Sequence, residues 1–297
     1  MGRSAVPERE DVFDSFEESI RARPEPNPWK FDGVTATYLP DHELLETLVG
    51  IPISERQGSE SGRLAKAIDA WVASELRRCG FPSDEVWPRL TKPRVLPREL
   101  GLYLNELPKG MRKAAWDQVL RNKRAAPSEA RVLGKAYVKQ VDVLVAQWSR
   151  GPELLISTKS MVSSFRNNLP NRFEESYGDA KNLRGRYPMV SMGFLFVLRS
   201  TVLDERGTFE RAIDMLRKLR NEQDVYDATC IVIAEWSGAS FDRVRLRQDA
   251  VPEDLRTDVF ISTLVDRVLD RTPVDMHVEV RERREHRELL LVENEDA

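Results

Sequence analysis

Apolar positions recur along the chain with two different periods, and the helical period is the clearer one. Between residues 63 and 79 they fall three and four apart and predict an amphipathic helix, with Glu75 as the polar member of its apolar stripe. Residues 82–108 contain five prolines and predict a loop with short elements. Helical spacing predicts four further helices, over 42–49, 110–122, 171–185 and 209–220.

Runs of β-branched and apolar residues predict four strands. Residues 136–148 and 153–159 flank the turn 149–152 and predict a β-hairpin. Two later runs, 189–198 and 229–236, are almost wholly apolar, as expected of strands that are buried on both faces. Because a predicted helix precedes each of these two, the chain should cross over between parallel strands. We therefore expect an α/β protein with a mixed central sheet flanked by helices.

The N-terminal part of the chain differs from the rest in composition. Three prolines between residues 24 and 28 disfavour a helix there, and the segment 58–62 is typical of a flexible joint. We expect residues 1–57 to form an extension and residues 58–297 to form one domain. The tail after Glu279 alternates arginine with glutamate, which predicts a solvated strand or helix that frays.

Composition narrows the class of protein. The 297 residues are 41% hydrophobic, enough for a sizeable core, and the formal net charge is −3. A nucleic-acid partner would therefore have to be bound by local positive charge. Cys79 and Cys230 lie far apart in apolar stretches, which predicts two buried thiols in a reducing compartment and no zinc site.

The sequence also bears on location. No apolar run approaches the ~20 residues of a membrane span. Residues 1–16 are acidic and lack the apolar core of a signal peptide. We expect a cytoplasmic protein that does not contact a membrane.

Candidate chemistry gathers on the predicted hairpin. Asp142 lies inside an apolar strand, and Ser157 and Lys159 lie near the end of the next strand. Side chains two apart on a strand share a face, so Ser157 and Lys159 should point the same way. Pairing of the two strands could place Asp142 beside them. Carboxylate and ammonium groups are costly to bury unless they pair with each other or with a metal.

This arrangement resembles the PD-(D/E)xK nuclease superfamily, whose restriction-endonuclease-like core has an aspartate on one strand and (D/E)xK on the next. Asp142 and Lys159 match that motif, and Ser157 departs from it. One branch of restriction endonucleases carries SxK and places the missing carboxylate on the following helix. Here that carboxylate would be Glu174 or Glu175, and we favour Glu174, whose helical register includes Gly178. The resemblance covers roughly residues 136–198.

The resemblance implies a Mg²⁺-dependent DNA endonuclease of restriction or defence type, for which Mn²⁺ is an alternative ion. It implies Asp142 as the bridging metal ligand and Glu174 or Glu175 as the second ligand. Lys159 would position the attacking water, and Ser157 would bind a metal-bound water. Restriction-type enzymes commonly act as dimers, so we expect a homodimer or a partner subunit.

Many members of the superfamily also carry an acidic residue on the helix before the sheet. Glu75 is the candidate in this chain, and Glu129, in a polar loop, is a weaker rival. The alternative is that Glu75 is only a boundary residue at the edge of its apolar stripe.

A basic segment precedes the motif. Between residues 109 and 139 nine lysines and arginines face only Asp117 and Glu129, a local excess of seven (9 − 2). Such a cluster fits phosphate contacts, although a charge run can also be a solvated face. The predicted loop after Lys159 could reach phosphates or base edges. The residues expected to contact nucleic acid are Lys113, Arg121, Lys123, Arg124, Lys135, Lys139, Arg166, Asn167 and Asn168.

Two other interpretations stay open. The chain could be a nuclease-fold protein that binds DNA or a partner protein without cutting, as the departure at Ser157 suggests. Alternatively, Asp142 and Lys159 could form a structural cross-strand ion pair. Other catalytic schemes lack support, because the three histidines have no nucleophile or metal partner at a recognisable spacing and no phosphate-binding glycine motif occurs.

Overall fold

The computed structural model describes residues 11–24, 26–55, 62–237 and 240–289, and the predicted joint at 58–62 lies mostly outside them. The helices are α1 (Asp14–Arg21), α2 (His42–Ser54), α3 (Arg63–Arg78), α4 (Arg98–Glu106), α5 (Lys109–Arg121), α6 (Phe165–Arg184), α7 (Thr208–Asn221), α8 (Thr257–Asp270) and α9 (Val278–Glu285). The strands are β1 (Trp29–Phe31), β2 (Ala36–Tyr38), β3 (Val86–Trp87), β4 (Ala130–Leu133), β5 (Val138–Val141), β6 (Val143–Gln147), β7 (Gly151–Met161), β8 (Ser191–Arg199), β9 (Ala228–Ser237) and β10 (Ser240–Leu246).

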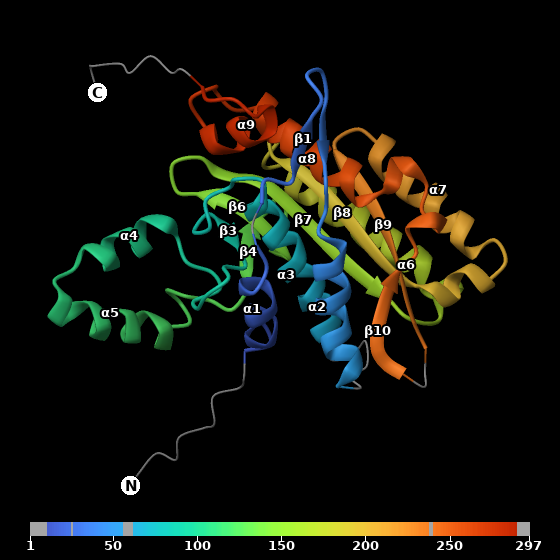
Figure 1. The fold of residues 1–297 in the computed structure, drawn as a ribbon, viewed down its shortest axis with the longest axis horizontal. Helices are drawn as coiled ribbons and strands as arrows, with labels where there is room; N and C mark the ends of the chain where they lie inside the picture. Colours follow the sequence, from blue (N-terminus) through green and yellow to red (C-terminus); the bar gives the residue numbers. More distant parts are fainter. Residues whose placement is uncertain (1–10, 25, 56–61, 238–239, 290–297) are drawn as a thin grey trace, which may run out of the picture.

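A six-stranded mixed sheet in the order β10-β9-β8-β7-β6-β3 forms the centre of the molecule (Figure 1). Strands β7, β8 and β9 are parallel and are connected through α6 and α7, whereas β6 and β10 pair antiparallel with β7 and β9. The predicted α/β class, the mixed sheet and the parallel crossovers are therefore confirmed. Within the described residues, no helix is long and apolar enough to cross a membrane.

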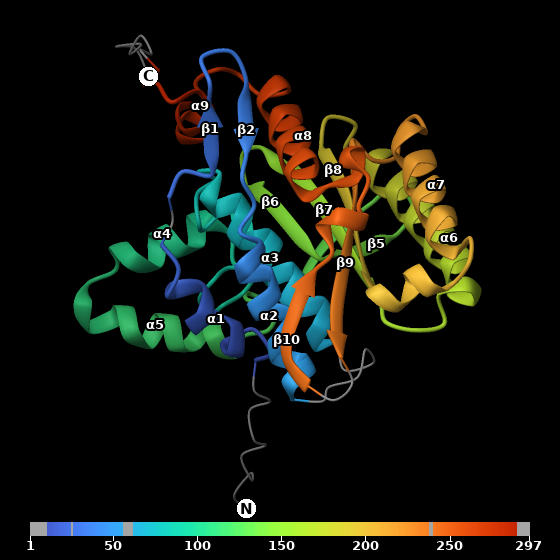
Figure 2. The ribbon, with the colours of Figure 1, turned by 45° about the vertical axis from the view of Figure 1, so that its right-hand side comes forward.

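Helices cover both faces of the sheet (Figure 2). Helices α2, α3 and α8 pack on one face, and α6 and α7 pack on the other, so that two hydrophobic clusters form, one on each side. Gly193 of β8 allows α8 to approach closely, because a Cβ atom there would lie 2.6 Å from Leu264 and 2.7 Å from Phe260. Cys79 and Cys230 are buried free thiols, as predicted.

The described part of residues 1–57 is built into the core on the α3 side of the sheet. Phe16, Trp29 and Tyr38 are almost wholly buried there. The buried guanidinium of Arg94 also pairs with three carboxylates around α1, those of Asp11, Asp14 and Glu17. This segment precedes the main domain in the sequence, but it packs as part of the body.

Two predicted elements differ from the structure in ways that affect the site. The predicted strand 136–148 is two strands, because the chain bends at Asp142 between β5 and β6. Helix α6 begins at Phe165 rather than near Asn171 and contains Pro170, whose missing N–H forfeits only one helical hydrogen bond. Arg166, Asn167 and Asn168 therefore lie on the first turn of a helix and not in a loop.

Candidate active site

The bend at Asp142 places its carboxylate against β7. Val143 pairs with Ile156, so the next step of the antiparallel register sets Asp142 opposite Ser157. The backbone N–H of Thr158 donates to Asp142 Oδ2 at 2.9 Å. Since β5 pairs with β4 and β6 pairs with β7, the residue at the junction is released from both ladders and can turn its side chain toward the end of β7.

Alternation along β7 sends the motif residues to opposite faces of the sheet. Ile156 packs in the cluster beneath α3, and Thr158, two residues on, points to the same side. Leu155 packs in the cluster beneath α6, and Ser157 and Lys159 continue that face. The predicted shared face of Ser157 and Lys159 is thus confirmed, and Thr158 belongs to the other side of the site.

A second carboxylate, Asp69 of α3, meets Asp142 at Thr158. The Thr158 hydroxyl donates to Asp69 Oδ1 at 2.5 Å, while its N–H donates to Asp142. The ammonium group of Lys66, one turn earlier on α3, lies 3.2 Å from Asp69 Oδ2. Asp69 is 1% exposed. One residue therefore holds two carboxylates from two different elements at the end of β7.

The two carboxylates have too little positive charge around them. Burial and then the charge of Asp142 raise the pKa of Asp69 to about 7, against the opposing effects of Lys66 and Thr158. Ionising Asp69 in the folded protein thus costs on the order of 4 kcal/mol more than in water. The ion pair with Lys66 offsets only part of this cost, so the stability of the fold gives no reason to keep two carboxylates here.

The same surroundings favour the charged form of Lys66, whereas they favour the neutral form of Asp69. Burial acts to lower the pKa of Lys66, but the carboxylates of Asp69 and Asp142, with Glu129, outweigh burial and raise it. Lys66 therefore stays a cation. Glu129, the weaker rival for an acidic role, acts on the same ammonium group and so lies at the margin of this cluster.

On the other face of β7, Lys159 meets a carboxylate of α6. Its Nζ atom lies 3.6 Å from Glu175 Oε1, and Arg172 donates to Glu175 Oε2 at 2.8 Å. Burial acts to raise the pKa of Glu175, but Lys159 and Arg172, together with Lys139, outweigh it and lower it. Glu174 is exposed on the neighbouring position of the helix. The structure therefore places Glu175, and not the favoured Glu174, beside Lys159, and the metal-ligand role of either residue stays a prediction.

The charge of Asp142 affects titratable groups on both faces of the sheet. Burial raises the pKa of Tyr226 well above its ordinary value, and the charges of Asp179, Asp142 and Glu175 raise it further. The hydroxyl of Tyr226 donates to the carbonyl oxygen of Ser176 on α6. Asp142 thus acts both on Asp69, on the α3 side, and on a buried phenol on the α6 side.

Glu75 does not belong to this site. It is fully buried, accepts a hydrogen bond from the Tyr38 hydroxyl at 2.6 Å and pairs with Arg78 at 2.7 Å. These contacts tie α3 to the N-terminal segment, so the proposal of a catalytic Glu75 is corrected, and so is the alternative of a boundary residue. Asp69, six residues earlier on the same helix, could not be predicted from the apolar stripe because it lies off it.

The predicted nucleic-acid contacts divide into residues that pair with a carboxylate and residues that do not. Lys139 pairs with buried Asp179, and Lys113 pairs with Asp117 at 2.8 Å. The paired state of Lys139 makes it an internal ion-pair partner rather than a surface contact. The remaining predicted contacts are exposed: Arg121, Lys123, Arg124, Lys135, Arg166, Asn167 and Asn168.

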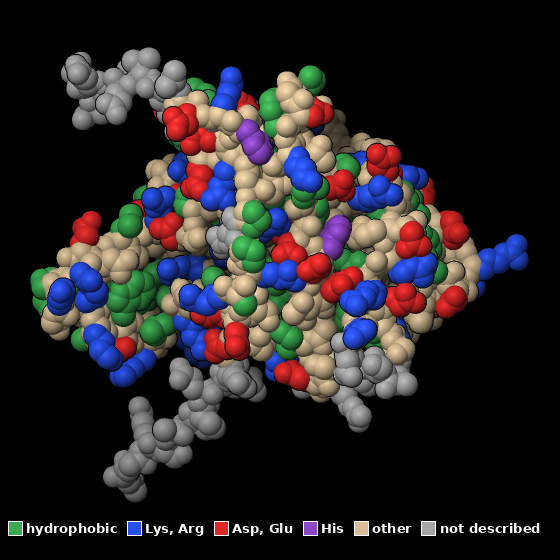
Figure 3. Space-filling view, viewed as in Figure 1, with side chains coloured by type: hydrophobic (Ala, Val, Ile, Leu, Met, Phe, Trp, Pro, Cys, Tyr) green, Lys and Arg blue, Asp and Glu red, His purple; other side chains and the backbone are tan. Residues whose placement is uncertain are grey.

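Helices α4 and α5 form an arm, residues 98–121, that projects from the body (Figure 1). No side chain of α5 is fully buried, and the arm exposes four large hydrophobic residues, Leu102, Tyr103, Met111 and Leu120. Lys and Arg side chains surround hydrophobic ones on this arm in Figure 3. The arm leads through residues 122–129 into β4 and β5, and so to Asp142.

A second group of potential metal ligands lies away from β7's motif. Glu85, Glu153 and His277 are buried, with ligand atoms within 4.8 Å of one another. Arg98 and Arg150 each lie 2.5 Å from Glu85, and Arg150 and His277 lie 2.9 and 3.0 Å from Glu153. Because every carboxylate oxygen already has a basic partner, we interpret this group as an ion-pair network that fixes the β6–β7 turn.

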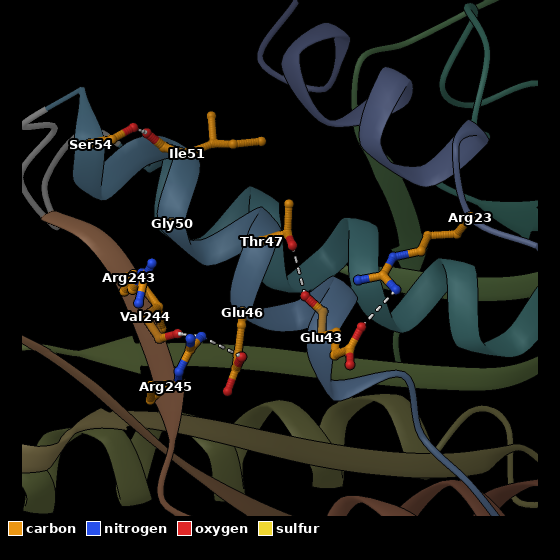
Figure 4. Close-up of a pocket in the computed structure, with 10 residues that line it drawn as sticks. All are labelled: Arg23, Glu43, Glu46, Thr47, Gly50, Ile51, Ser54, Arg243, Val244 and Arg245. Atoms are coloured by element: carbon orange, nitrogen blue, oxygen red, sulfur yellow. Dashed lines mark hydrogen bonds and ion pairs between the residues drawn. The ribbon is translucent and has the colours of Figure 1, made fainter.

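A groove of about 570 Å³ lies between α2 and β10 (Figure 4). Its acidic residues are paired, with Arg23 donating to Glu43 at 3.0 Å and Arg245 donating to Glu46 at 3.1 Å. Strands β8 and β9 separate β10 from β7, so this groove is remote from Asp142.

Comparison with models of known protein families gives no match, and comparisons with curated proteins and with solved structures give none either. The function must therefore be inferred from the residues of this chain.

Proposed function

We propose that the protein is a metal-dependent DNA endonuclease whose centre is formed by Asp142, Asp69, Thr158, Lys159 and Glu175. The observation that carries this proposal is the meeting of Asp142 and Asp69 at Thr158. Two carboxylates that share one hydrogen-bonding residue, with a single lysine beside them, form a set of oxygen donors with unbalanced negative charge. Strongly perturbed carboxyl groups of this kind are typical of functional sites.

The donor set fits a divalent cation. Mg²⁺ prefers oxygen ligands and is commonly bound by one or two carboxylates and water. Asp142 would be the bridging ligand, and Asp69, in place of Glu75, would be the acidic residue on the helix before the sheet. Such an ion, when bound, would stabilise negative charge on the phosphate and lower the pKa of its water. A cation would compete with the proton for Asp69, whose pKa is raised to about 7, so that its binding near neutral pH would release a proton.

Lys159 and Glu175 would serve the same reaction from the α6 side. Glu175 holds the ammonium group of Lys159 near the end of β7. A lysine in this position can offset charge on a phosphate and orient an attacking water. Glu175 would also be the carboxylate that follows the SxK motif, with Ser157 beside it on the same face.

DNA as the substrate is supported by the distribution of positive charge. Lys109, Arg121, Lys123, Arg124, Arg131 and Lys135 form no ion pair with a carboxylate among the described residues. They occupy the arm, its connection to β4, β4 itself and the β4–β5 turn. Unneutralised cations of this density on the segments that lead to Asp142 favour contact with a phosphate backbone over a merely solvated face.

Cleavage of plasmid and genomic DNA in Mg²⁺ or Mn²⁺ tests the proposal. Wild type should cut only with metal, and Asp142→Ala and Lys159→Ala should each lower the rate by roughly a hundredfold or more. Asp214→Ala, which removes an exposed carboxylate of α7, is the matched control and should cut like wild type. DNA binding without cutting on any substrate would favour the binding-only alternative, and neither binding nor cutting would overturn the proposal.

A further inference from the structure

Asn182 of α6 makes an unusual number of contacts with the turn between β4 and β5. Its Oδ1 atom accepts hydrogen bonds from the backbone N–H groups of Ala136 at 2.8 Å and Tyr137 at 3.2 Å. Its Nδ2 group donates to the carbonyl oxygen of Tyr137 at 3.1 Å, and its own carbonyl accepts from Lys135 N at 2.8 Å. Asn182 is 6% exposed. One buried side chain therefore forms hydrogen bonds with several backbone groups of the turn.

The turn is shaped to receive that side chain. A Cβ atom on Gly134 would overlap the Nδ2 and Cγ atoms of Asn182, closer than two non-bonded atoms can approach. Asparagine is short, and three hydrogen bonds hold this one, so it has little freedom to move aside. Glycine at position 134 is thus required for the approach of the turn to α6.

Asp179, one turn earlier on α6, continues the same contact along β5. It is 6% exposed, accepts a hydrogen bond from the Tyr137 hydroxyl at 3.1 Å and pairs with Lys139. Glu175, a further turn back, pairs with Lys159 of β7. Residues spaced three and four apart share one face of a helix. This face of α6 therefore holds β5 and β7 at the same time.

The strand that α6 holds in this way ends at the candidate centre. Lys139 and Asp142 are three residues apart, and Asp142 follows directly after β5. At the bend Asp142 has left the ladder between β4 and β5, so its position depends on where β5 is anchored. On the other side, Glu175 fixes Lys159 from the same helix.

We propose that Asn182, with Asp179, is a positioning residue that sets Asp142 in register with Lys159 and Glu175 by clamping β5 to α6. This inference rests on the proposed function for its catalytic consequence, but the clamp itself can be measured without a substrate. Neither residue needs to touch DNA or metal to play this part.

The test compares Asn182→Ala with Tyr177→Phe in the full-length protein. Tyr177→Phe removes a hydrogen bond of the same helix, to Glu222, that does not involve β5. We expect Asn182→Ala to lower kcat about 10- to 100-fold with DNA Kd changed less than about twofold. Hydrogen exchange over residues 135–142 should quicken about tenfold or more, while exchange in β8 stays unchanged. Tyr177→Phe should change none of these.

A double-mutant cycle keeps the proposal testable if Asn182→Ala folds poorly. Gly134→Ala alone should lower kcat and loosen residues 135–142, because its methyl group collides with Asn182. In the Asn182→Ala background the same change should add little. The isosteric Asn182→Asp, which replaces the donor to Tyr137 O, should give an intermediate loss.

Hydrogen exchange and DNA cleavage together distinguish failure of the clamp from failure of the proposed function. If exchange over 135–142 responds as expected but wild type cuts no DNA, the clamp stands and the proposed function fails. If exchange in Asn182→Ala matches wild type, or if Gly134→Ala and Asn182→Ala act additively, the positioning role is wrong whatever the activity.

Discussion

Thr158 joins the candidate centre because one residue presents two donors in two directions. Its N–H lies in the plane of the sheet and reaches Asp142, while its side chain stands perpendicular to the sheet and reaches Asp69. Serine at 157 and lysine at 159 cannot do this, because they point to the α6 side. The middle residue of the Ser-Thr-Lys run therefore connects the two halves of the site.

The pKa of Asp69 predicts how metal affinity depends on pH. Below about pH 7 the neutral acid predominates and must lose its proton before the carboxylate can bind a cation. The affinity for Mn²⁺ should therefore rise roughly tenfold per pH unit up to about pH 7 and level off above it. Calorimetric titrations between about pH 5.5 and pH 8 would show this. An equally steep rise in Asp69→Asn would contradict the assignment.

The neighbouring glutamates of α6 should differ sharply in their effect on cleavage. Glu175 contacts Lys159, and exposed Glu174 does not, so Glu175→Gln should lower kcat by roughly a hundredfold. Glu174→Gln should leave kcat within about twofold of wild type. Steady-state rates of the two isosteric variants decide the matter, and equal losses would mean that the pairing with Lys159 is not the relevant contact.

Part of the candidate centre can be predicted from the sequence. Asp142, Ser157 and Lys159 were predicted from strand periodicity and from the family resemblance, and the structure gathers them at the end of β7. Asp69 and Thr158 were not, because their meeting depends on how α3 packs across β7. No spacing along the chain encodes that contact, since 89 residues separate the two.

The role of the arm in DNA binding can be measured directly. Its helices contact each other, for example where Trp116 Nε1 donates to Asn105 Oδ1 at 3.2 Å, and its cations Lys109, Lys113 and Arg121 are exposed. Replacing Arg121, Lys123 and Arg124 with glutamine should weaken DNA binding on any sequence. It should also reduce the slope of log Kd against log salt by about 0.9 for each phosphate that the variant no longer neutralises.

A matched control for the arm exists on α7. Arg217 and Lys218 are exposed cations that pair with Asp254 and Asp214, so replacing both with glutamine should leave the slope unchanged. If the two sets of substitutions reduce the slope equally, the effect is one of net charge and the arm has no special part in binding.

Most helices and strands of the body can be predicted from the spacing of apolar residues, and the exceptions have physical causes. The helices 63–79 and 209–220 and the buried strands β8 and β9 lie within a residue or two of their predicted ends. Helix α4 was hidden among five prolines. The start of α6 was hidden by a polar first turn and Pro170, which tertiary packing of Phe165 and Leu169 overrides.

For the whole molecule, the mixed sheet flanked by helices was predictable, but the place of the N-terminal segment was not. Its proline-rich composition is typical of an extension, yet Phe16, Trp29 and Tyr38 complete the core beneath α3. The Glu75–Tyr38–Arg78 contacts show why a buried acid on α3 is structural at one position and part of the candidate centre at another. Only the arrangement of distant segments distinguishes Glu75 from Asp69.

The proposed place for a divalent cation is at Asp142 and Asp69, whereas the carboxylates of Glu85 and Glu153 are already paired with basic groups. Anomalous scattering from crystals of the full-length protein saturated with Mn²⁺ would locate the ion directly. We expect an ion about 2.1 Å from an oxygen of Asp142, with Asp69 or Glu175 as a further ligand. An ion held instead by Glu85, Glu153 and His277, or no ion near Asp142 at saturation, would contradict it.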